Sequence, residues 1–225
     1  MKITFKVQAV DLYEPKEITI KSIKQAEAIV GGLTKTSKMP SLSLSIPARE
    51  CRKGSKLREI AGSVCSGCYA MKGCYSWKST QKAQYRRLYA LESPLWVKAM
   101  VYLLEHKKAV QSSGVFRWHD SGDLQDLKHF EKVLEVVRRT PHIRHWLPTK
   151  ESELVKNYGG ELPENLVIRL SGSMIDGNPP SFPNTSTVTT SKHLATCRAF
   201  ENNGECGTCR KCWDSSVDNV VYFKH

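Results

Sequence analysis

Residues 114–125 read GVFRWHDSGDLQ, and this stretch decides the predicted fold. An apolar run, residues 115–118, stops abruptly at polar residues, and an amphipathic helical pattern starts directly after them. A buried strand that delivers polar groups to its carboxyl end is typical of α/β proteins, which keep their chemistry there. The two carboxylates, the imidazole and the hydroxyl therefore predict a functional site. The alternative is a plain strand-to-helix turn, with Asp120 or Ser121 as the helix cap and Gly122 at positive φ.

The same strand-to-helix pattern repeats along the chain. Strands are predicted at residues 115–118, 143–147 and 166–170, and helices at residues 124–139 and 151–158 lie between them. This β-α-β-α-β order implies parallel strands joined by right-handed crossovers. Polar groups follow the three strands at residues 119–123, 148–150 and 171–176. We therefore expect a TIM-barrel-like α/β fold, reduced or incomplete, with its active face at the carboxyl ends of the strands.

The whole chain, residues 1–225, is expected to form a single domain with three parts. Residues 1–35 are expected to form an N-terminal β-hairpin and helix, residues 36–190 the β/α core, and residues 191–225 a cysteine-rich metal-binding segment. The hairpin pairs residues 2–9 with residues 17–20, and the helix spans residues 22–30. The other predicted elements are a strand at residues 40–46, helices at 76–91 and 94–106, and strands at 185–190 and 220–223.

The charge of the chain favours a polyanionic partner. The 34 Lys and Arg residues outnumber the 22 acidic residues, which gives a formal net charge of +12. Such an excess attracts nucleic acid through long-range electrostatics and counterion release, although a basic soluble protein is the simpler interpretation. No apolar run is long enough to span a membrane, and the N-terminus has no apolar signal core. We expect a cytoplasmic protein, in the host cytoplasm if it is phage-encoded.

Eight cysteines fall into two groups, and in a cytoplasmic chain they favour metal over disulfides. The first group is Cys51, Cys65, Cys68 and Cys74. The two-residue gap between Cys65 and Cys68 lets both thiolates face one metal, and the other two can complete the set. A second metal or cluster site is the prediction here, although the spacing is not the three-then-two pattern usual for a radical S-adenosylmethionine cluster. The alternative is that some of these cysteines are small buried apolar residues without a ligand.

The second group, Cys197, Cys206, Cys209 and Cys212, is the stronger metal signal. Four cysteines lie within sixteen residues, and the glycines at 204 and 207 permit tight turns. Zinc is the expected cofactor, in a structural role, and an iron–sulfur cluster is the alternative because thiolates serve both.

Five strings together resemble an uncharacterised phage family that is known only by a gene-product number. They are SLSIPA before Cys51, CSGCYAMKG at 65–73, RWHDSGDL at 117–124, WLPTK at 146–150 and ECGTCRKCWD at 205–214. The resemblance covers most of residues 41–214 and implies a role in phage DNA modification.

A second resemblance is to tRNA-guanine transglycosylases and their DNA-acting relatives, which insert 7-deazaguanine bases in place of guanine. Residues 120–125, DSGDLQ, are similar to the Asp-Ser-Gly-Gly-Phe-Gln motif of that family, and residues 148–150, PTK, resemble the end of its nucleophile motif. The resemblance implies a barrel fold, a zinc site and an acid–base or base-recognition role for Asp120. An acid is missing before residues 148–150, the chain is much shorter, and all its candidate zinc ligands are cysteines, so the nucleophile is unassigned. Asp123 and Asp176 are the candidates.

The residue types suit this chemistry. Exchange at a glycosidic carbon benefits from one carboxylate that attacks or stabilises the sugar and a second group that protonates the leaving base. Asp120, Asp123 and Asp176 are the expected catalytic residues. The residues expected to bind substrate are His119, Ser121, Gly122, Trp146, Lys150, Arg169 and Ser171.

Three hypotheses follow, in order of preference. The first is a DNA-guanine transglycosylase-like enzyme, a glycosyltransferase that exchanges guanine in double-stranded DNA for a 7-deazaguanine base. The second is a radical-type iron–sulfur enzyme that acts on nucleic acid or a nucleotide through Cys51, Cys65 and Cys68. The third is a zinc-containing nucleic-acid-binding protein without catalytic activity. No membrane partner is expected, and the oligomeric state is left open.

Overall fold

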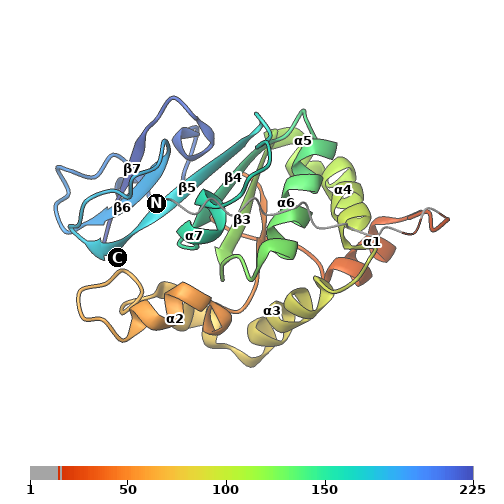
Figure 1. Cartoon of the computed structure of the whole chain (residues 1–225), viewed down its shortest axis with the longest axis horizontal. Helices are drawn as coiled ribbons and strands as arrows, with labels where there is room; N and C mark the ends of the chain where they lie inside the picture. The colour runs from red at the N-terminus through yellow and green to blue at the C-terminus, as the bar shows by residue number, and fades with distance from the viewer. Residues whose placement is uncertain (1–14, 16, 225) are drawn as a thin grey trace.

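The fold is built on one sheet of seven strands. The computed structural model describes residue 15 and residues 17–224. Its strands follow the chain in the order β1-β2-β3-β4-β5-β6-β7 (Figure 1), and every neighbouring pair is parallel except β1 and β2. They are β1 (Thr34–Lys35), β2 (Leu42–Ser45), β3 (Val115–Ser121), β4 (Arg144–Thr149), β5 (Leu166–Ile175), β6 (Thr185–Thr189) and β7 (Asn219–Phe223). The predicted mixed α/β class and the parallel order are thereby confirmed.

The sheet is open. Within the described residues β1 pairs only with β2, and β7 pairs only with β6, so the expected barrel does not close. Closure of a parallel barrel requires about eight strands whose tilt and stagger agree. The six parallel strands from β2 to β7 are too few for that geometry, and no described segment joins the two edges.

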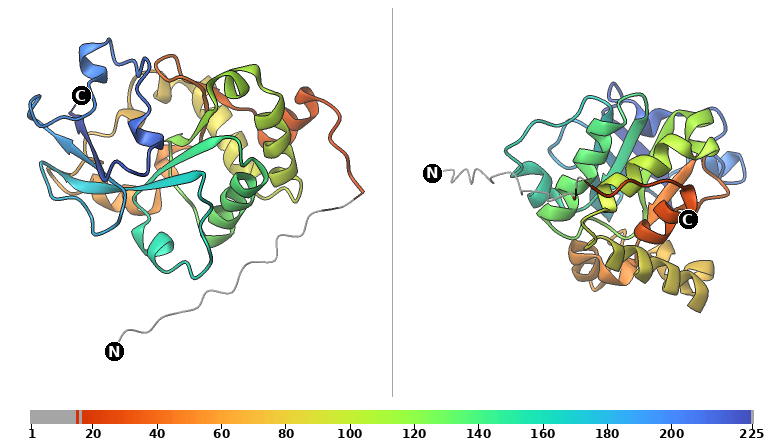
Figure 2. Two further views of the ribbon diagram at one scale, coloured as in Figure 1. Left: turned by 90° about the horizontal axis from the view of Figure 1, so that it is seen from above. Right: turned by 90° about the vertical axis from the view of Figure 1, so that its right-hand side faces the viewer.

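One face of the sheet is covered by helices. The helices are α1 (Ile23–Val30), α2 (Arg52–Arg58), α3 (Lys78–Ala90), α4 (Trp96–His106), α5 (Lys108–Ser113), α6 (Leu127–Arg139) and α7 (Ser152–Lys156). Apolar residues of α1, α4, α6 and α7 pack with strand residues such as Phe116 and Leu147 in the main core. Figure 2 shows α2 and α3 apart from this layer, below the sheet, where the strands end.

Local sequence signals begin and end the helices as expected. The Ser22 hydroxyl accepts a bond from the Gln25 amide at 3.1 Å, and Gly31 ends α1 at a φ of 84°. This confirms the predicted helix at residues 22–30. Asp126 caps α6 by accepting from the His129 amide at 2.7 Å. The cap moves the start of α6 three residues past the predicted start and leaves residues 122–126 as a loop at the site.

The opposite face is covered by the segment between β6 and β7. Val115, Trp146 and Trp213 form a small apolar cluster there, and the Trp213 indole donates to the Phe116 carbonyl at 2.8 Å. Two 3₁₀ turns, η4 (Ala199–Glu201) and η5 (Lys211–Trp213), lie in this segment. The segment carries the second cysteine group, so those cysteines sit against a sheet face and not beside the helix layer.

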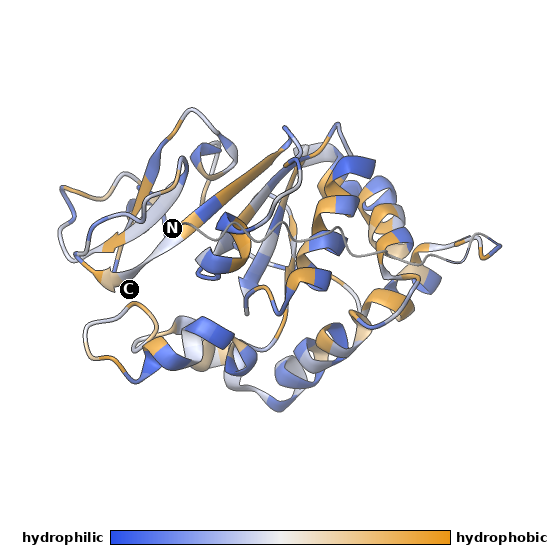
Figure 3. Cartoon of the chain, viewed as in Figure 1, coloured by the Kyte–Doolittle hydropathy of each residue, from blue (hydrophilic) through white to orange (hydrophobic). Residues whose placement is uncertain are grey.

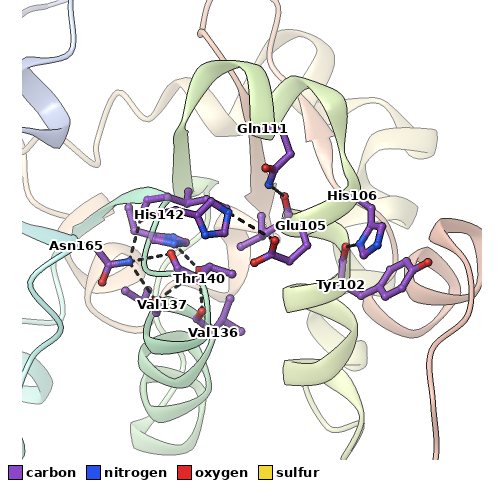
Figure 4. A network of polar contacts seen from close by, with 12 residues as sticks. Tyr102, Glu105, His106, Gln111, Val136, Val137, Thr140, His142 and Asn165 are labelled. Carbon is purple, nitrogen blue, oxygen red and sulfur yellow. Dashed lines mark hydrogen bonds and ion pairs between the residues drawn. The ribbon is translucent and has the colours of Figure 1, made fainter.

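The amino ends of the strands are held by a polar network (Figure 4). The Asn165 side chain donates to the carbonyls of Val137, Thr140 and Ile143 at 3.0–3.1 Å. The Thr140 hydroxyl bonds His145 Nε2 at 2.9 Å. These bonds tie the end of α6 to the starts of β4 and β5 and satisfy buried polar groups. This edge is structural, and the candidate functional residues lie at the opposite edge.

Several predicted elements differ from the structure. The first hairpin strand, residues 2–9, lies outside the described residues, and its partner at residues 17–20 forms no strand. β3 and β5 run further than predicted, because polar residues such as Asp120 and Ser171 find partners in neighbouring segments. Three elements, β1, α2 and α5, are not predicted from the sequence, because they are short and lack apolar periodicity. No helix of the described chain is long and apolar enough to cross a bilayer.

Candidate functional site

The loop after β3 places Asp123 in a buried cage at the carboxyl edge. Asp123 is 6% exposed and accepts from the Thr149 hydroxyl at 2.5 Å and from the amides of Lys150 and Leu124 at 2.8 Å each. Burial raises its pKa to about 6, and these three donors limit the rise. The end of β4, predicted from PTK, is therefore brought to the DSGD loop as expected. The carboxyl group is held in one orientation and can change charge near neutral pH.

Asp120 lies on β3 itself, in a different environment from Asp123. One of its carboxylate oxygens accepts from the Ser43 hydroxyl, and the other accepts from Tyr75 at 3.0 Å. Burial raises the pKa of Asp120, and the guanidinium of Arg117 opposes the rise. Tyr69 also donates to the Asp120 carbonyl. Asp120 thus joins β2, β3 and the first cysteine loop.

His119 faces away from the two acids. Its φ of 53° interrupts the alternation of β3, so Trp118 and His119 both point toward the helices. The His119 ring packs against His129 of α6 with ring centroids 5.1 Å apart. Neither ring nitrogen of His119 has a hydrogen-bond partner among the described residues, and burial holds its pKa well below its usual range. The His119 side chain therefore lies on the face of the sheet that the helices cover, and its role in binding substrate stays a prediction.

Ser121 and Gly122 hold the end of β3 against β2. The Ser121 hydroxyl donates to the Ile46 carbonyl at 3.0 Å and accepts from Gln84 at 3.2 Å. Gly122 has a φ of 83°, and a Cβ there would lie 2.3 Å from the Ile46 side chain. Only glycine fits this close approach of two strand ends. Gly122 thus has the positive φ of the plain-turn interpretation, but Asp126 caps the helix and not Asp120 or Ser121.

The first cysteine loop lies across the carboxyl ends of β2 to β5. The Lys53 amide donates to Glu151 at 2.8 Å, and the Lys53 ammonium donates to Ser152 at 2.7 Å. Further along, the Val64 amide donates to the Ser173 carbonyl at 2.8 Å, which extends β5 with a short bridge. Together with the bonds from Tyr69 and Tyr75, these contacts place the loop over the edge that carries Asp123.

Two cysteines of this loop, Cys51 and Cys65, come together, and Cys68 lies within electrostatic reach of both; we name the three the thiol cluster. A Cβ added at Gly54 would lie 3.6 Å from the Cys65 sulfur and 3.7 Å from the Cys51 sulfur, so both sulfurs border one point. Burial raises the pKa of Cys51 and Cys65, and both lie within electrostatic reach of Cys68 and Asp123. The ammonium of Lys150 opposes the rise at Cys65 and donates to the Gly172 carbonyl at 2.5 Å.

The fourth cysteine of the loop does not join the thiol cluster. Cys74 is exposed in the 3₁₀ turn η3 (Gly73–Ser76). In the part of the chain that the structure describes, no three His, Cys, Asp or Glu side chains are close enough to hold a single metal ion. Thiolates around one zinc ion, each about 2.3 Å from the metal, must lie close together. Which cofactor, if any, the thiol cluster holds therefore stays a prediction.

The second cysteine group lies on the face of the sheet that the helices do not cover. Cys206 and Cys209 flank a tight turn, and Cys197 lies within electrostatic reach of Cys206 and Cys212. Arg169 is fully buried, and its guanidinium binds only backbone carbonyls. These belong to Thr185, Lys211, Cys212, Asp214 and Val217. Arg169 thus organises the cysteine segment on β5, and a metal at these cysteines stays a prediction.

The remaining predicted residues are spread over the molecule. Trp146 lies against Trp213, with Arg117 stacked 4.6 Å from its ring, on the face away from the helices. Asp176 is exposed and accepts from Thr189 and Thr190, so it stabilises the end of β6. Ser171 bonds Ser186 at 3.2 Å. The structure therefore brings Asp120, Asp123 and Lys150 to one edge but does not bring Trp146 or Arg169 there.

The match to known families covers most of the chain. A family model described as Gene product 88 matches residues 16–215. The chain belongs to the Gene product 88 family. This confirms the resemblance to an uncharacterised phage-type family, but it carries no link to transglycosylases or to DNA modification. No curated protein and no solved structure matches the chain.

Several site residues of this Gene product 88 protein escaped the sequence analysis. Thr149 and Ser43 bind the two acids, and Gly54 makes room for the thiols. Thr149 stands in the quoted WLPTK string, so its position at a strand end was a usable signal. The sequence around Gly54 gave no such signal, because a glycine among basic residues is typical of an ordinary loop.

Proposed function

We propose that the protein is a radical-type iron–sulfur enzyme whose cluster is held by Cys51, Cys65 and Cys68. The observation that supports this most is the grouping of the three thiols at the carboxyl edge of an open parallel sheet, beside Asp123 and Lys150. Enzymes with parallel sheets bind ligands at this edge. The proposal moves the second of the three hypotheses ahead of the first.

The donor set fits such a group. Thiolates are the usual ligands of iron–sulfur clusters, and four cysteines complete a four-iron cluster. Three cysteines leave one iron without a protein ligand, which is where a small cofactor such as S-adenosylmethionine would bind. When bound, the cluster and such a cofactor supply radical chemistry. The chain's own residues have to provide charge balance, orientation and proton transfer.

Lys150 and Asp123 are suited to those tasks. The Lys150 ammonium is buried near Cys65 and Cys68, where its positive charge favours the thiolate form that metal binding needs. The Gly172 carbonyl fixes the ammonium in place. Asp123, with a pKa of about 6, can accept or donate a proton near neutral pH without moving. Covering the edge with the cysteine loop excludes water from the reacting groups.

Base exchange is the second candidate function, favoured by the two buried acids on one loop. Burial raises the pKa of both Asp120 and Asp123, and that difference from ordinary carboxyls suits acid–base work. Against it, Ser43 and Tyr75 occupy the Asp120 oxygens, and Asp176 lies elsewhere. Asp120→Asn leaving base exchange intact would remove its support.

Metal analysis tests the proposal. Protein purified without oxygen is assayed for iron, acid-labile sulfide, zinc and visible absorption, and about four irons per chain are expected. Changing Cys51, Cys65 and Cys68 together to alanine should abolish iron and colour. Cys74→Ala is the matched control and should keep both, because Cys74 is exposed outside the thiol cluster. A colourless protein with zinc and no iron would overturn the proposal.

A further inference from the structure

One stretch of the chain carries cations and no acids. From residue 60 to residue 91 there is no Asp or Glu. Its basic residues are Lys72, Lys78, Lys82, Arg86 and Arg87. A stretch of this length without acids is unusual in a chain that has 22 of them. It forms α3 and the turns before it, the part drawn below the sheet in Figure 1.

The exposed face of α3 presents these cations in a row. Lys78, Lys82 and Arg86 follow one another at intervals of four, so they share one side of the helix with Tyr89. The helix buries Gln84 and Arg87 on its other side. Figure 3 shows α3 mostly in hydrophilic colours, in contrast to the apolar α4.

Large aromatic side chains stand among these cations. Trp77 is 63% exposed, Tyr89 69% and Tyr69 50%. The Tyr85 ring lies 6.0 Å from Tyr89, which extends the aromatic surface along the helix. Exposed rings of this size cost free energy in water, so their grouping indicates a surface that another molecule covers.

The lysines of this face lack partners. Among the residues that the structure describes, Lys72, Lys78 and Lys82 form no ion pair. Two lysines elsewhere in the described chain do: Lys107 pairs with Glu27 at 2.5 Å, and Lys128 pairs with Glu92 at 3.1 Å. The Arg86 guanidinium donates two hydrogen bonds to the Gly31 carbonyl, each at 3.1 Å. A neutral carbonyl does not compensate a guanidinium, so the uncompensated charge on this face comes from the lysines and from Arg86.

The buried side of α3 and the turn before the helix are bonded directly to the candidate site. Gln84 of α3 donates to Ser121 at 3.2 Å, and Tyr75 donates to Asp120 at 3.0 Å. Arg87 donates to the Ser45 hydroxyl at 2.8 Å. A molecule that lies along α3 would thus reach the edge where the thiol cluster and Asp123 lie.

From these observations we infer that the exposed face of α3, with Trp77, binds a single-stranded segment of nucleic acid. Lysines without acidic partners suit phosphates, and exposed rings suit unpaired bases, which offer flat faces for stacking. Paired bases in a duplex keep those faces covered. The inference names the substrate class of the iron–sulfur site and rests on that proposed function for its catalytic meaning.

Tryptophan fluorescence provides a direct assay. Trp77 is exposed, whereas Trp96, Trp118, Trp146 and Trp213 are at most 5% exposed, and together they are all five tryptophans of the chain. Titration with a short single-stranded oligonucleotide should quench the emission to saturation. Trp77→Phe should lose the quenching but keep the affinity, measured by anisotropy of a labelled oligonucleotide, because phenylalanine still stacks. Trp77→Ala should weaken binding about tenfold or more.

The lysines are tested through the salt dependence of binding. Lys78→Ala and Lys82→Ala should each reduce the slope of log affinity against log salt by about 0.7. Lys108→Ala is the matched control, because Lys108 is exposed on α5, before the start of β3. Its slope should be that of the wild type.

Every variant is also assayed for iron and visible absorption, so the two proposals fail separately. Oligonucleotide binding that is unaffected by Trp77→Ala and by both lysine variants would overturn the inference, as would tighter binding of the duplex form of the same sequence. Normal binding by a protein without iron would overturn the proposed function and leave the binding surface standing. Iron at the expected level without binding would do the reverse.

Discussion

Gly54→Ala is the sharpest test of the thiol cluster. The added Cβ would lie 2.9 Å from the Cys51 Cβ and within 3.7 Å of the sulfurs of Cys51 and Cys65. A contact of 2.9 Å forces Cys51 to shift, because its Cβ is bonded directly to the backbone and no side-chain rotation can move it away. The substitution therefore changes the position of a ligand without removing any ligand.

The magnitude follows from two opposing effects. Alanine inside α2 gains up to about 1 kcal/mol of helix propensity, while the overlap costs about 1–3 kcal/mol. The metal-free protein should thus lose at most about 3 kcal/mol of unfolding free energy. Iron affinity should fall about 10- to 100-fold, the range typical when a group that supports a ligand is changed.

The assay compares iron, sulfide and visible absorption with unfolding in urea. Gly67→Ala is the matched control in the same loop, because a Cβ there meets no atom within 4 Å. It should keep its iron. Wild-type iron content in Gly54→Ala would refute the reasoning, and so would an equal loss of iron in both variants.

Three further predictions concern stability and the second cysteine group. Arg169→Met should lower the unfolding free energy by about 3–5 kcal/mol, because five backbone carbonyls, one in a buried bond and four in partly buried bonds, lose their donor; urea denaturation showing a loss below about 1 kcal/mol would contradict this. Burial lowers the pKa of His129 to about 4 and of His145 to about 3. Below about pH 6.5 the unfolded chain therefore binds more protons than the folded protein, so the unfolding free energy should decrease as the pH is lowered, by about 1.4 kcal/mol per pH unit for each histidine. The raised pKa of Asp123, about 6, acts in the opposite direction between about pH 4 and 6 but offsets only one histidine, and His145→Gln should flatten the measured slope. If the C-terminal cysteines bind zinc, Cys209→Ser should lower zinc content and leave iron unchanged; unchanged zinc would refute that assignment.

Much of the fold was predictable because its signals are local. The apolar run of β3, the apolar spacing of α6 and the helix at residues 22–30 are read within a few residues, and all appear in the structure. The edge that carries the site followed from the parallel order of the strands. Closure of the barrel was not predictable in this way, since it depends on strand number and twist summed over the whole sheet.

The sequence by itself determined the parallel β/α order, the polar strand ends with Asp120 and Asp123, and the two groups of cysteines. Only the tertiary structure decided which of these residues meet. Cys51 and Cys65 come together near Cys68 while Cys74 stays outside, because hydrogen bonds from the loop to β4 and β5 fix its path. Such bonds join residues far apart in the chain, and neither spacing nor periodicity encodes them.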